Sequence, residues 1–365
     1  MPPPLVSIVI DNHNYARFLG AAIESALGQS HRPLEVVVVD DGSTDGSRAI
    51  IAAYGERVRA VLQDNQGQSG AFNSGFAACS GDIVLFLDSD DVLHPGAAAA
   101  IVASWRPDVA KLQFCLATID ADGLLLGTVF PRYPARLTPA AIRAATLRSA
   151  LYPCPPTSGN AYARSFLDRV MPVPAVFAGA DGPLNTLAPL YGDVLTLDRV
   201  LGCYRVHGAN DGAQAQLAAD KFARFIRHDR QRADLLRQHA ARRGIVLRGD
   251  PLDNALLHLQ YRIASRRLLP AAHPVPGETA AGIAWRGVRA AWLSREEGLA
   301  GRLFLVLWFP AVALLPRPVA RRLLAFRFVP ASRPAALGSV LRRLGVLRQT
   351  GDAMAPAIPA PPRSR

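Results

Sequence analysis

The stretch Leu85-Phe86-Leu87-Asp88-Ser89-Asp90-Asp91 joins an apolar run, which begins at Ile83, to three carboxylates within four residues. A continuous apolar run of this length is typical of a strand that is buried on both faces of a parallel sheet. Carboxylates this close repel one another, and a bound cation would offset the repulsion. Oxygen ligands at the end of a buried strand suit Mg²⁺ or Mn²⁺. The alternative is a solvated acidic turn in which Asp90 or Asp91 caps the next helix.

Predicted strands and helices alternate along the first hundred residues, which indicates an α/β fold with a doubly wound sheet. Apolar runs predict strands at Leu5–Ile10, Leu34–Val39 and Arg57–Leu62, and apolar spacing predicts helices at Ala16–Gln29, Ser47–Tyr54 and Ser69–Cys79. In such sheets, ligands bind beyond the carboxyl ends of the strands. We therefore expect the polar loops at residues 11–15, 40–45 and 88–91 to converge on one edge.

After Pro95 the pattern is less regular, and the C-terminal third is predicted to be mostly α-helical. Residues 151–159 are rich in Pro and Ser and are expected to form a loop over the site. The expected strands are a hairpin of Val109–Thr118 and Leu124–Phe130 and two strands at Val194–Leu197 and Arg199–Tyr204. A short helix is expected from Thr138 to Leu147. Longer helices are expected at 213–243, at 251–268 and after Pro274 up to about Ser294.

Charge is distributed unevenly along the 365 residues. Residues 221–365 carry 26 basic and 8 acidic side chains, a net charge of +18, whereas the first 220 residues have a net charge of −6. Such asymmetry indicates different partners for the two halves. Nucleic acid is disfavoured because no binding motif is present and the aromatic residues lie inside apolar runs. An anionic membrane surface is the better candidate for the basic half.

The stretch Leu303–Leu315 is apolar throughout, with Pro310 inside it and arginines on both sides. Its 13 residues are fewer than the ~20 that cross a bilayer as a helix. This favours a segment that lies in the membrane interface or dips into it, with the arginines at the headgroups. The alternative is a core helix of a helical subdomain.

The four cysteines lie far apart, without a CxxC pair, which favours neither a zinc site nor a disulfide framework and fits a reducing cytosol. The N-terminus lacks the basic and apolar regions of a signal peptide. Asp11-Asn12-His13-Asn14 follows the first strand, where a dinucleotide-binding dehydrogenase would need G-x-G-x-x-G. A nucleotidyltransferase is disfavoured at the same place, because no Gly-rich, basic phosphate loop follows the strand.

Several motifs together resemble glycosyltransferase family 2, in the order and spacing of that family. They are Val6–Ile10, Glu24–Ser30, Val39–Asp45, Asn65–Gly75 and Phe86–Asp91. The resemblance is strong over residues 5–100 and continues more weakly to Arg205-Val206-His207-Gly208-Ala209-Asn210, which is similar to the closing motif of the family. The last third of the chain carries no motif of this kind.

The resemblance implies a GT-A fold that binds a nucleotide-diphosphate sugar, with Mn²⁺ or Mg²⁺, and transfers the sugar with inversion. Asp41 matches the residue that hydrogen-bonds the base, Asp88 matches the first aspartate of Asp-x-Asp near the ribose, and Asp90 matches the metal-binding aspartate. A divalent ion would stabilise the charge that develops on the diphosphate. His207 is a candidate third metal ligand, and the alternative is a histidine that orders its loop.

Further donor-binding candidates lie in the same loops. Asp11 stands where the family usually has Pro or Thr, and His13 stands where a Tyr often stacks near the base. Histidine can also stack on a base. Asp40 and Gln68 belong to two of the matching motifs and complete the expected donor-binding set.

Inverting transfer needs a base that takes the proton of the acceptor hydroxyl. The family usually places this base in a Glu-Asp pair after a Gly-rich loop, and the best match is Ala178-Gly179-Ala180-Asp181-Gly182-Pro183. Asp181 is therefore the candidate base, with Ala180 in the place of the glutamate. The alternative is an aspartate that caps the helix starting at Pro183.

The resulting prediction is a cytoplasmic enzyme, peripheral to or dipping into the inner face of the membrane, that glycosylates a hydroxyl of a glycan or glycolipid. Cell-surface polysaccharide assembly is the expected context. A polyprenyl-phosphate sugar synthase is the nearest alternative, and a catalytically silent membrane scaffold is the alternative outside enzymes. The expected organisation is a catalytic domain at 1–212, a helical, Arg-rich, membrane-associated region at 213–350 and a disordered tail at 351–365.

Overall fold

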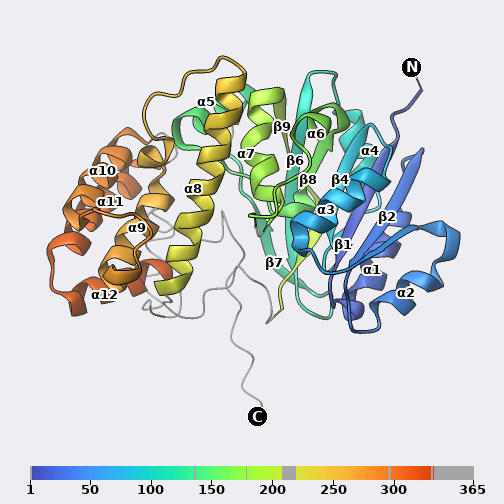
Figure 1. Cartoon of the computed structure of the whole chain (residues 1–365), viewed down its shortest axis with the longest axis horizontal. Coiled ribbons are helices and arrows are strands. Elements are labelled where there is room, and N and C mark those ends of the chain that lie inside the picture. Colours follow the sequence, from blue (N-terminus) through green and yellow to red (C-terminus); the bar gives the residue numbers. More distant parts are fainter. Residues whose placement is uncertain are drawn as a thin grey trace, which may run out of the picture. The chain divides into compact units, whose positions relative to one another are not determined.

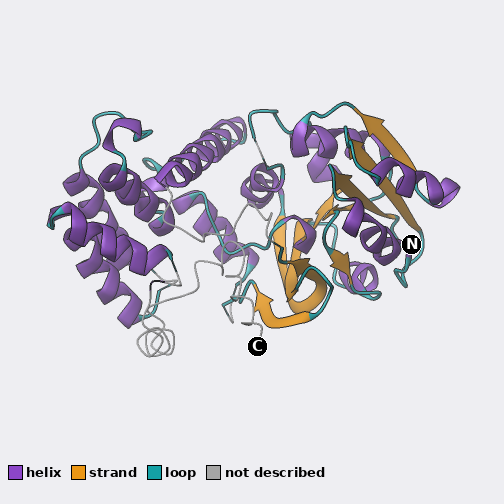
Figure 2. Cartoon of the chain, turned by 90° about the horizontal axis from the view of Figure 1, so that it is seen from below, coloured by secondary structure: helices purple, strands orange, loops and turns teal. Residues whose placement is uncertain are grey.

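A computed structural model describes residues 2–134, 137–177, 179–207, 219–294, 297–329 and 332. The chain divides into two compact units, one of residues 1–143 with 153–208 and one of residues 144–152 with 209–365. Within the described residues all strands belong to the first unit, whereas the second is helical (Figures 1 and 2). This confirms the prediction of a GT-A-like α/β fold with a mostly α-helical C-terminal region. The predicted tail at 351–365 lies outside the described residues.

A single mixed sheet forms the frame of the first unit. Its strand order is β3-β2-β1-β4-β8-β6-β9-β5, with β7 paired to β6. The first four strands of this order run parallel, and β8 is antiparallel to both of its neighbours. The strands are β1 Val6–Asn12, β2 Leu34–Asp41, β3 Arg59–Gln63, β4 Ile83–Asp88, β5 Val92–Leu93, β6 Val109–Ile119, β7 Leu125–Phe130, β8 Asn160–Ala163 and β9 Asp193–Arg205.

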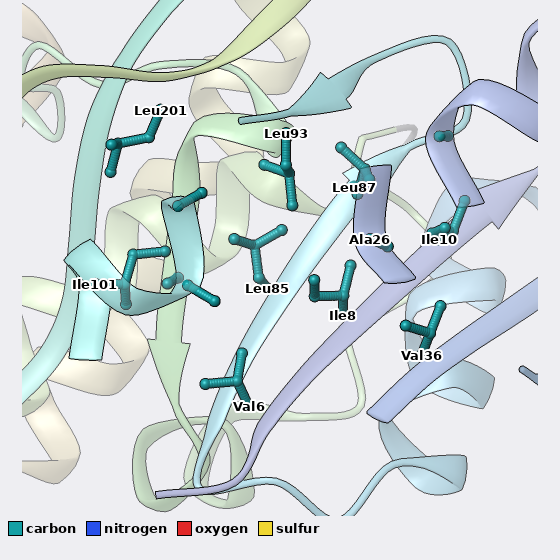
Figure 3. Packing of buried hydrophobic residues seen from close by; sticks show 14 of the residues in the cluster. Val6, Ile8, Ile10, Ala26, Val36, Leu85, Leu87, Leu93, Ile101 and Leu201 are labelled. Carbon is teal, nitrogen blue, oxygen red and sulfur yellow. The ribbon is translucent and has the colours of Figure 1, made fainter. Parts of the chain in front are cut away.

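Helices pack on this sheet because the apolar side chains of β1, β2 and β4 need cover on both faces. In Figure 3, Ile8 of β1 and Leu85 of β4 point into one cluster with Ala26 of α1 and Ile101 of α4. On α3, a Cβ at Gly75 would collide with Val9, so glycine lets this helix lie close to β1. The helices that lie wholly in this unit are α1 Ala16–Leu27, α2 Ser47–Ala53, α3 Gly67–Ala78, α4 Ala97–Ala103, α6 Arg164–Val170 and α7 Asp181–Tyr191, whereas the residues of α5 Pro139–Ser149 are divided between the two units.

The middle of the chain differs from the sequence prediction at two places. The two strands expected at 194–204 are one strand, β9, whose pairing with β6 shifts register near Cys115 instead of breaking. The loop expected at 151–159 ends in a 3-10 turn, Thr157–Gly159, followed by β8, which the sequence did not predict. Four residues carry little periodicity of their own, and β8 is defined by its pairing with β4 and β6.

The second unit packs its helices around a separate apolar core, which includes Phe222, Ile263, Phe309 and Phe328. The expected helix at 213–243 is described from Ala219 onward. Among the described residues, none of the helices combines the length and the apolar composition needed to span a bilayer. Beside the 3-10 turns Pro251–Asn254 and Pro270–Ala272, the helices are α8 Ala219–Arg242, α9 Leu256–Leu268, α10 Ala280–Leu293, α11 Leu299–Leu314 and α12 Arg317–Phe328.

Candidate active site

The register of the parallel strands brings the acidic loops to one edge of the sheet. Asp11 at the end of β1 lies opposite Asp88 at the end of β4, and Asn12 lies opposite Asp40 of β2. In parallel strands the carboxyl ends meet on the same side, so a one-residue offset between strands would separate these side chains. The sheet therefore gathers carboxylates from loops that lie far apart in the sequence.

Asp88, Asp90 and Asp91 each offer a carboxylate oxygen, and these oxygens lie within 4.8 Å of one another. We call these three residues the acidic cluster. Asp91 is fully buried and accepts a hydrogen bond of 2.6 Å from Ser158 Oγ and one of 2.8 Å from the backbone N–H of Arg205. Because both oxygens of Asp91 are engaged in this way, its main contribution is to hold the loop in place.

Asp90 lies against His207, with 2.9 Å between His207 Nε2 and Asp90 Oδ2. The imidazole stacks on the ring of Phe18 at a centroid distance of 5.2 Å and meets Tyr15 edge-on at 5.6 Å. Arg205 Nε donates a hydrogen bond of 2.7 Å to the backbone oxygen of Asp90. These contacts place a carboxylate and an imidazole side by side at the acidic cluster.

The electrostatics of the site fit a bound cation. Removal from water and the neighbouring carboxylates raise the pKa of Asp88 and of Asp91 well above the ordinary value. Removal from water also raises the pKa of Asp11 to about 7, despite a hydrogen bond from Gln68. Asp11 Oδ1 is buried and has no hydrogen-bond partner among the described residues. A divalent cation would stabilise the ionised form of this oxygen-rich cluster.

Gln68, on α3, links the acidic cluster to the start of α7. Its Nε2 atom donates to Asp88 Oδ1 at 3.0 Å and to Asp11 Oδ2 at 3.2 Å, and its Oε1 atom accepts from the backbone N–H of Ala180 at 3.4 Å. Asp181 is the next residue and begins α7. The negative charge of Asp181 contributes to the raised pKa of Asp88, so the two carboxylates repel one another electrostatically. Ala178, the first residue of the expected base motif, lies outside the described residues.

A buried lysine, which the sequence analysis did not single out, interacts electrostatically with Asp181. Lys111 lies in β6, fully shielded from solvent, and its Nζ donates a hydrogen bond of 3.1 Å to Gln113 Oε1. Burial lowers the pKa of Lys111 to about 8, and the charge of Asp181 opposes this shift. The available signal was a charged residue inside an otherwise apolar strand, which is rare unless the charge is paired.

The loops beside β2 form a second group of polar contacts. Asp41 Oδ1 accepts hydrogen bonds from Gln63 Nε2 at 2.7 Å and from the backbone N–H of Gln66 at 2.8 Å. His13 Nδ1 donates to the backbone oxygen of Asp41 at 2.7 Å, and the imidazole is exposed. A neutral ring protonated at Nδ1 leaves Nε2 to accept from Asn14 Nδ2 at 3.1 Å.

Asp40 differs from Asp41 because it is paired with a cation. Arg48 Nε lies 2.7 Å from Asp40 Oδ2, and Asn12 Nδ2 donates to Oδ1 at 3.1 Å. Burial alone would raise the pKa of Asp40, but the hydrogen bonds from Arg48, Ser43 and Asn12 outweigh it and lower the pKa. These contacts hold the loop at residues 40–45 in its conformation. We therefore expect any effect of Asp40 on donor binding to act through the shape of this loop.

Contacts therefore join the predicted residues into two groups, Asp11, Gln68, Asp88, Asp90, Asp181 and His207 in one and His13, Asp40 and Asp41 in the other. Sequence reasoning missed Ser158, Lys111 and the anchoring role of Arg205. Ser158 Oγ also accepts from the backbone N–H of Asp88 at 3.2 Å, so this side chain bridges both ends of the acidic loop. No local pattern marks such a serine, because its partners are more than sixty residues away.

Comparisons with known proteins identify the family of this chain. The family model for glycosyl transferase family 2 matches residues 7–124. An uncharacterized glycosyltransferase of Nostoc sp. is 38% identical over 223 residues, which cover 59% of this chain and 69% of that protein. Chondroitin synthase of Escherichia coli is 38% identical over 130 residues, 34% of this chain and 19% of that protein. The succinoglycan biosynthesis protein ExoO of Rhizobium meliloti is 39% identical over 123 residues, 33% of this chain and 35% of that protein.

Among solved structures, the S. aureus TarS 1–349 fragment in complex with UDP-GlcNAc superposes with a TM-score of 0.55 at 17% sequence identity. The match covers 88% of this chain and 90% of the fragment. At this identity the likeness concerns the fold. The Nostoc relative and the family model lead to one conclusion: the chain belongs to glycosyltransferase family 2.

Proposed function

We propose that this glycosyltransferase is a metal-dependent, inverting enzyme that moves a sugar from a nucleotide-diphosphate sugar to a hydroxyl of a glycan or glycolipid. One observation carries the proposal: Gln68 connects the acidic cluster to the residue before Asp181. A group that can hold the donor diphosphate and a group that can activate the acceptor are thereby fixed relative to one another. Such fixed positioning is a large part of enzymatic rate acceleration.

In this proposal the nucleotide lies over the two groups of polar contacts. Asp41, held by Gln63 and Gln66, keeps a carboxylate oriented toward the base, and His13 offers an exposed ring for stacking. Asp88 and Asp11, bridged by Gln68, would lie at the ribose and diphosphate end. Asp40 keeps the loop in shape through Arg48.

Asp90 and His207 would hold Mn²⁺ or Mg²⁺. The ion would supply positive charge to the diphosphate as the bond to the sugar breaks. His207 is oriented by the Phe18 and Tyr15 rings, which leaves its Nε2 directed at Asp90. Asp91, buried and hydrogen-bonded to Ser158, fixes the loop that presents Asp90.

Asp181 takes the proton of the acceptor hydroxyl as the hydroxyl oxygen bonds to the anomeric carbon. Attack from the side of Asp181, with the diphosphate leaving on the other side, inverts the configuration. Lys111 lies buried within electrostatic reach of Asp181 and would favour its ionised form, whereas the nearby carboxylate of Asp88 opposes it.

The relatives support a polysaccharide or glycolipid acceptor, since a chondroitin synthase and a succinoglycan biosynthesis protein each match about a third of this chain. The chain spans only about a fifth to a third of those two proteins. We propose that the enzyme works at the inner face of the membrane as a peripheral protein, where lipid-linked acceptors lie.

Asp181→Asn tests the proposal. Donors are first identified by calorimetry of the wild type with UDP-, GDP- and dTDP-sugars in the presence of Mn²⁺. With the hydroxyl acceptor, the variant should lose ~10²–10⁴ in transfer rate, the usual contribution of a positioned general base. Donor affinity should stay the same, because Asp181 serves the acceptor. Asp168→Asn, an exposed change on α6 with the same loss of charge, is the control.

A variant that keeps most of its rate on the native acceptor would contradict the hydroxyl acceptor. It would point to a polyprenyl-phosphate acceptor instead, because an ionised phosphate needs no base. A wild type that binds none of the nucleotide-sugars would contradict the enzyme and favour a scaffold.

A further inference from the structure

Exposed leucines form a stripe along α11. Leu299, Leu303, Leu307 and Leu314 recur at the spacing of one helix face, and their exposed fractions are 71, 46, 73 and 78%. On the other side of the helix, Trp308, Phe309 and Val312 are buried in the core of the second unit. Arg302 is the single charged residue of α11. The helix is therefore apolar all round, and no described residue covers its outer face to an extent that would shield the leucines.

The preceding helix, α10, has exposed aromatic residues. Trp285 and Trp292 are seven residues apart, on one face, with exposed fractions of 72 and 62%. Arg289 lies between them and is also exposed. α10 packs closely on α11, because a side chain at Gly287 would collide with the Phe309 ring. Tryptophan is the residue most typical of the boundary between water and lipid.

The charged residues within α10, α11 and α12 are all of one sign. Residues 280–294 and 298–329 contain seven arginines and no aspartate or glutamate. Three of these arginines, Arg317, Arg321 and Arg322, are exposed on α12, which begins directly after the leucine stripe. Arg286 of α10 is already paired with Glu278 and Asp253, so the positive border of the apolar face is formed by the exposed arginines of α12.

We propose that the outer face of α11, formed by Leu299, Leu303, Leu307 and Leu314, docks on an anionic lipid bilayer with the arginines of α12 at the headgroups. Charge decides between the possible occupants. A second copy of this chain would bring its own arginines to the contact, whereas anionic lipid supplies acyl chains and the opposite charge together.

The length of α11 fixes the mode of docking. Its 16 residues extend about 24 Å at 1.5 Å per residue, less than the ~30 Å of the hydrocarbon layer. The helix therefore lies in the plane of the interface with its leucines in the acyl region. This inference rests on the proposed function for the lipid-linked acceptor that such docking would serve, but its test does not depend on catalysis.

Sedimentation of the full chain with vesicles tests the docking. Vesicles of phosphatidylcholine with phosphatidylglycerol should carry the wild type into the pellet, and vesicles of phosphatidylcholine alone should carry much less. Leu307→Glu should lower the partition coefficient by about tenfold or more, because a large apolar side chain leaves the acyl region. Val246→Glu is the matched control, since it makes the same charge change at an exposed valine of the second unit.

The partition coefficient of Val246→Glu should stay within about twofold of that of the wild type. One added negative charge near an anionic surface is expected to lower binding only modestly. Wild-type protein that stays in the supernatant with the anionic vesicles, or a Leu307→Glu variant that sediments like the wild type, would overturn the proposal. So would a wild-type dimer, seen without lipid, that Leu307→Glu converts to a monomer. Metal-dependent hydrolysis of the donor by Leu307→Glu should match that of the wild type, so a failure of docking is distinguishable from a failure of the enzyme assignment.

Discussion

In the second unit the buried carboxylate of Glu278 lies among Arg262, Arg286 and His273, whereas in the first unit Asp88 lies among other carboxylates. Burial by itself would raise the pKa of Glu278, but its hydrogen bonds and the nearby guanidinium groups lower the pKa to about 2. The pKa of Asp88 moves the other way, because removal from water and its neighbours both raise it.

The difference separates two uses of buried charge. The ion-pair network of Glu278 is complete within the described chain, and Arg262 also reaches Asp253 Oδ1 at 3.1 Å. Such a network defines a structure, and breaking it leaves uncompensated charges. In the acidic cluster, neighbouring carboxylates raise the pKa of Asp88 and of Asp91, which is the pattern expected at a functional site, and a cation would offset their repulsion.

Asp90→Asn should have the largest effect on the transfer rate. Transfer should fall by several orders of magnitude, at ~1.4 kcal/mol per tenfold, if Asp90 holds the metal that stabilises the leaving diphosphate. The melting temperature of the metal-free protein should stay the same or rise, because one repelling carboxylate is removed. Rates with and without EDTA and a thermal melt check both parts.

Asp168→Asn, on the exposed side of α6, should change neither quantity. Full activity of Asp90→Asn after EDTA treatment would contradict the contrast drawn between the acidic cluster and the Glu278 network, because the acidic cluster would then need no cation.

Glu278→Gln should give the opposite result. Loss of the carboxylate leaves Arg262 and Arg286 without their main partner, and unfolding should require ~3–5 kcal/mol less free energy. Donor hydrolysis per folded molecule should be unchanged. Asp234→Asn is the control, because its ion pair with Arg237 is exposed and should contribute at most ~1 kcal/mol.

Acid titration of this stability checks that the cause is electrostatic. A carboxyl group whose pKa is lowered on folding stabilises the protein above its unfolded pKa and loses that contribution as the pH falls toward its folded pKa. The advantage of the wild type over Glu278→Gln should therefore be constant above about pH 4.5 and decline toward pH 2. If the difference in unfolding free energy between the wild type and Glu278→Gln did not change with pH, the destabilisation would be due to packing and not to charge.

Asp41→Ala should have the smallest effect of the three changes. It adds a third environment to the comparison of Glu278 with Asp88, because the hydrogen-bond donors around the Asp41 carboxylate are neutral. Gln63 and Gln66 hold Asp41 in place, and a hydrogen bond donated by the base to Asp41 would contribute ~1.5–3 kcal/mol to donor binding. Calorimetry should show weaker donor binding with a smaller change in the saturated rate. Glu56→Ala, at an exposed turn, is the control, and unchanged affinity in Asp41→Ala would reduce Asp41 to a turn residue.

Local patterns predicted the first hundred residues well, because each element there is encoded within its own window. The apolar run Ile83–Leu87 needs two buried faces wherever it lies, and β4 occupies Ile83–Asp88. Helical spacing likewise predicted α1, whose buried residues include Ala22 and Ile23. The failures are at β8 and β9, where pairing with distant strands determines the outcome.

The sequence by itself determined the family, the alternating strands and helices, the acidic loops and the basic, apolar C-terminal third. These features follow from motifs, composition and periodicity, which require no knowledge of distant contacts. Tertiary structure alone decided that Gln68 joins Asp88 to Ala180, that Ser158 holds Asp91 and that Lys111 lies buried within reach of Asp181. The physical reason is that burial, charge coupling and hydrogen bonds depend on separation in space, and the fold brings together residues that are more than a hundred positions apart in the chain.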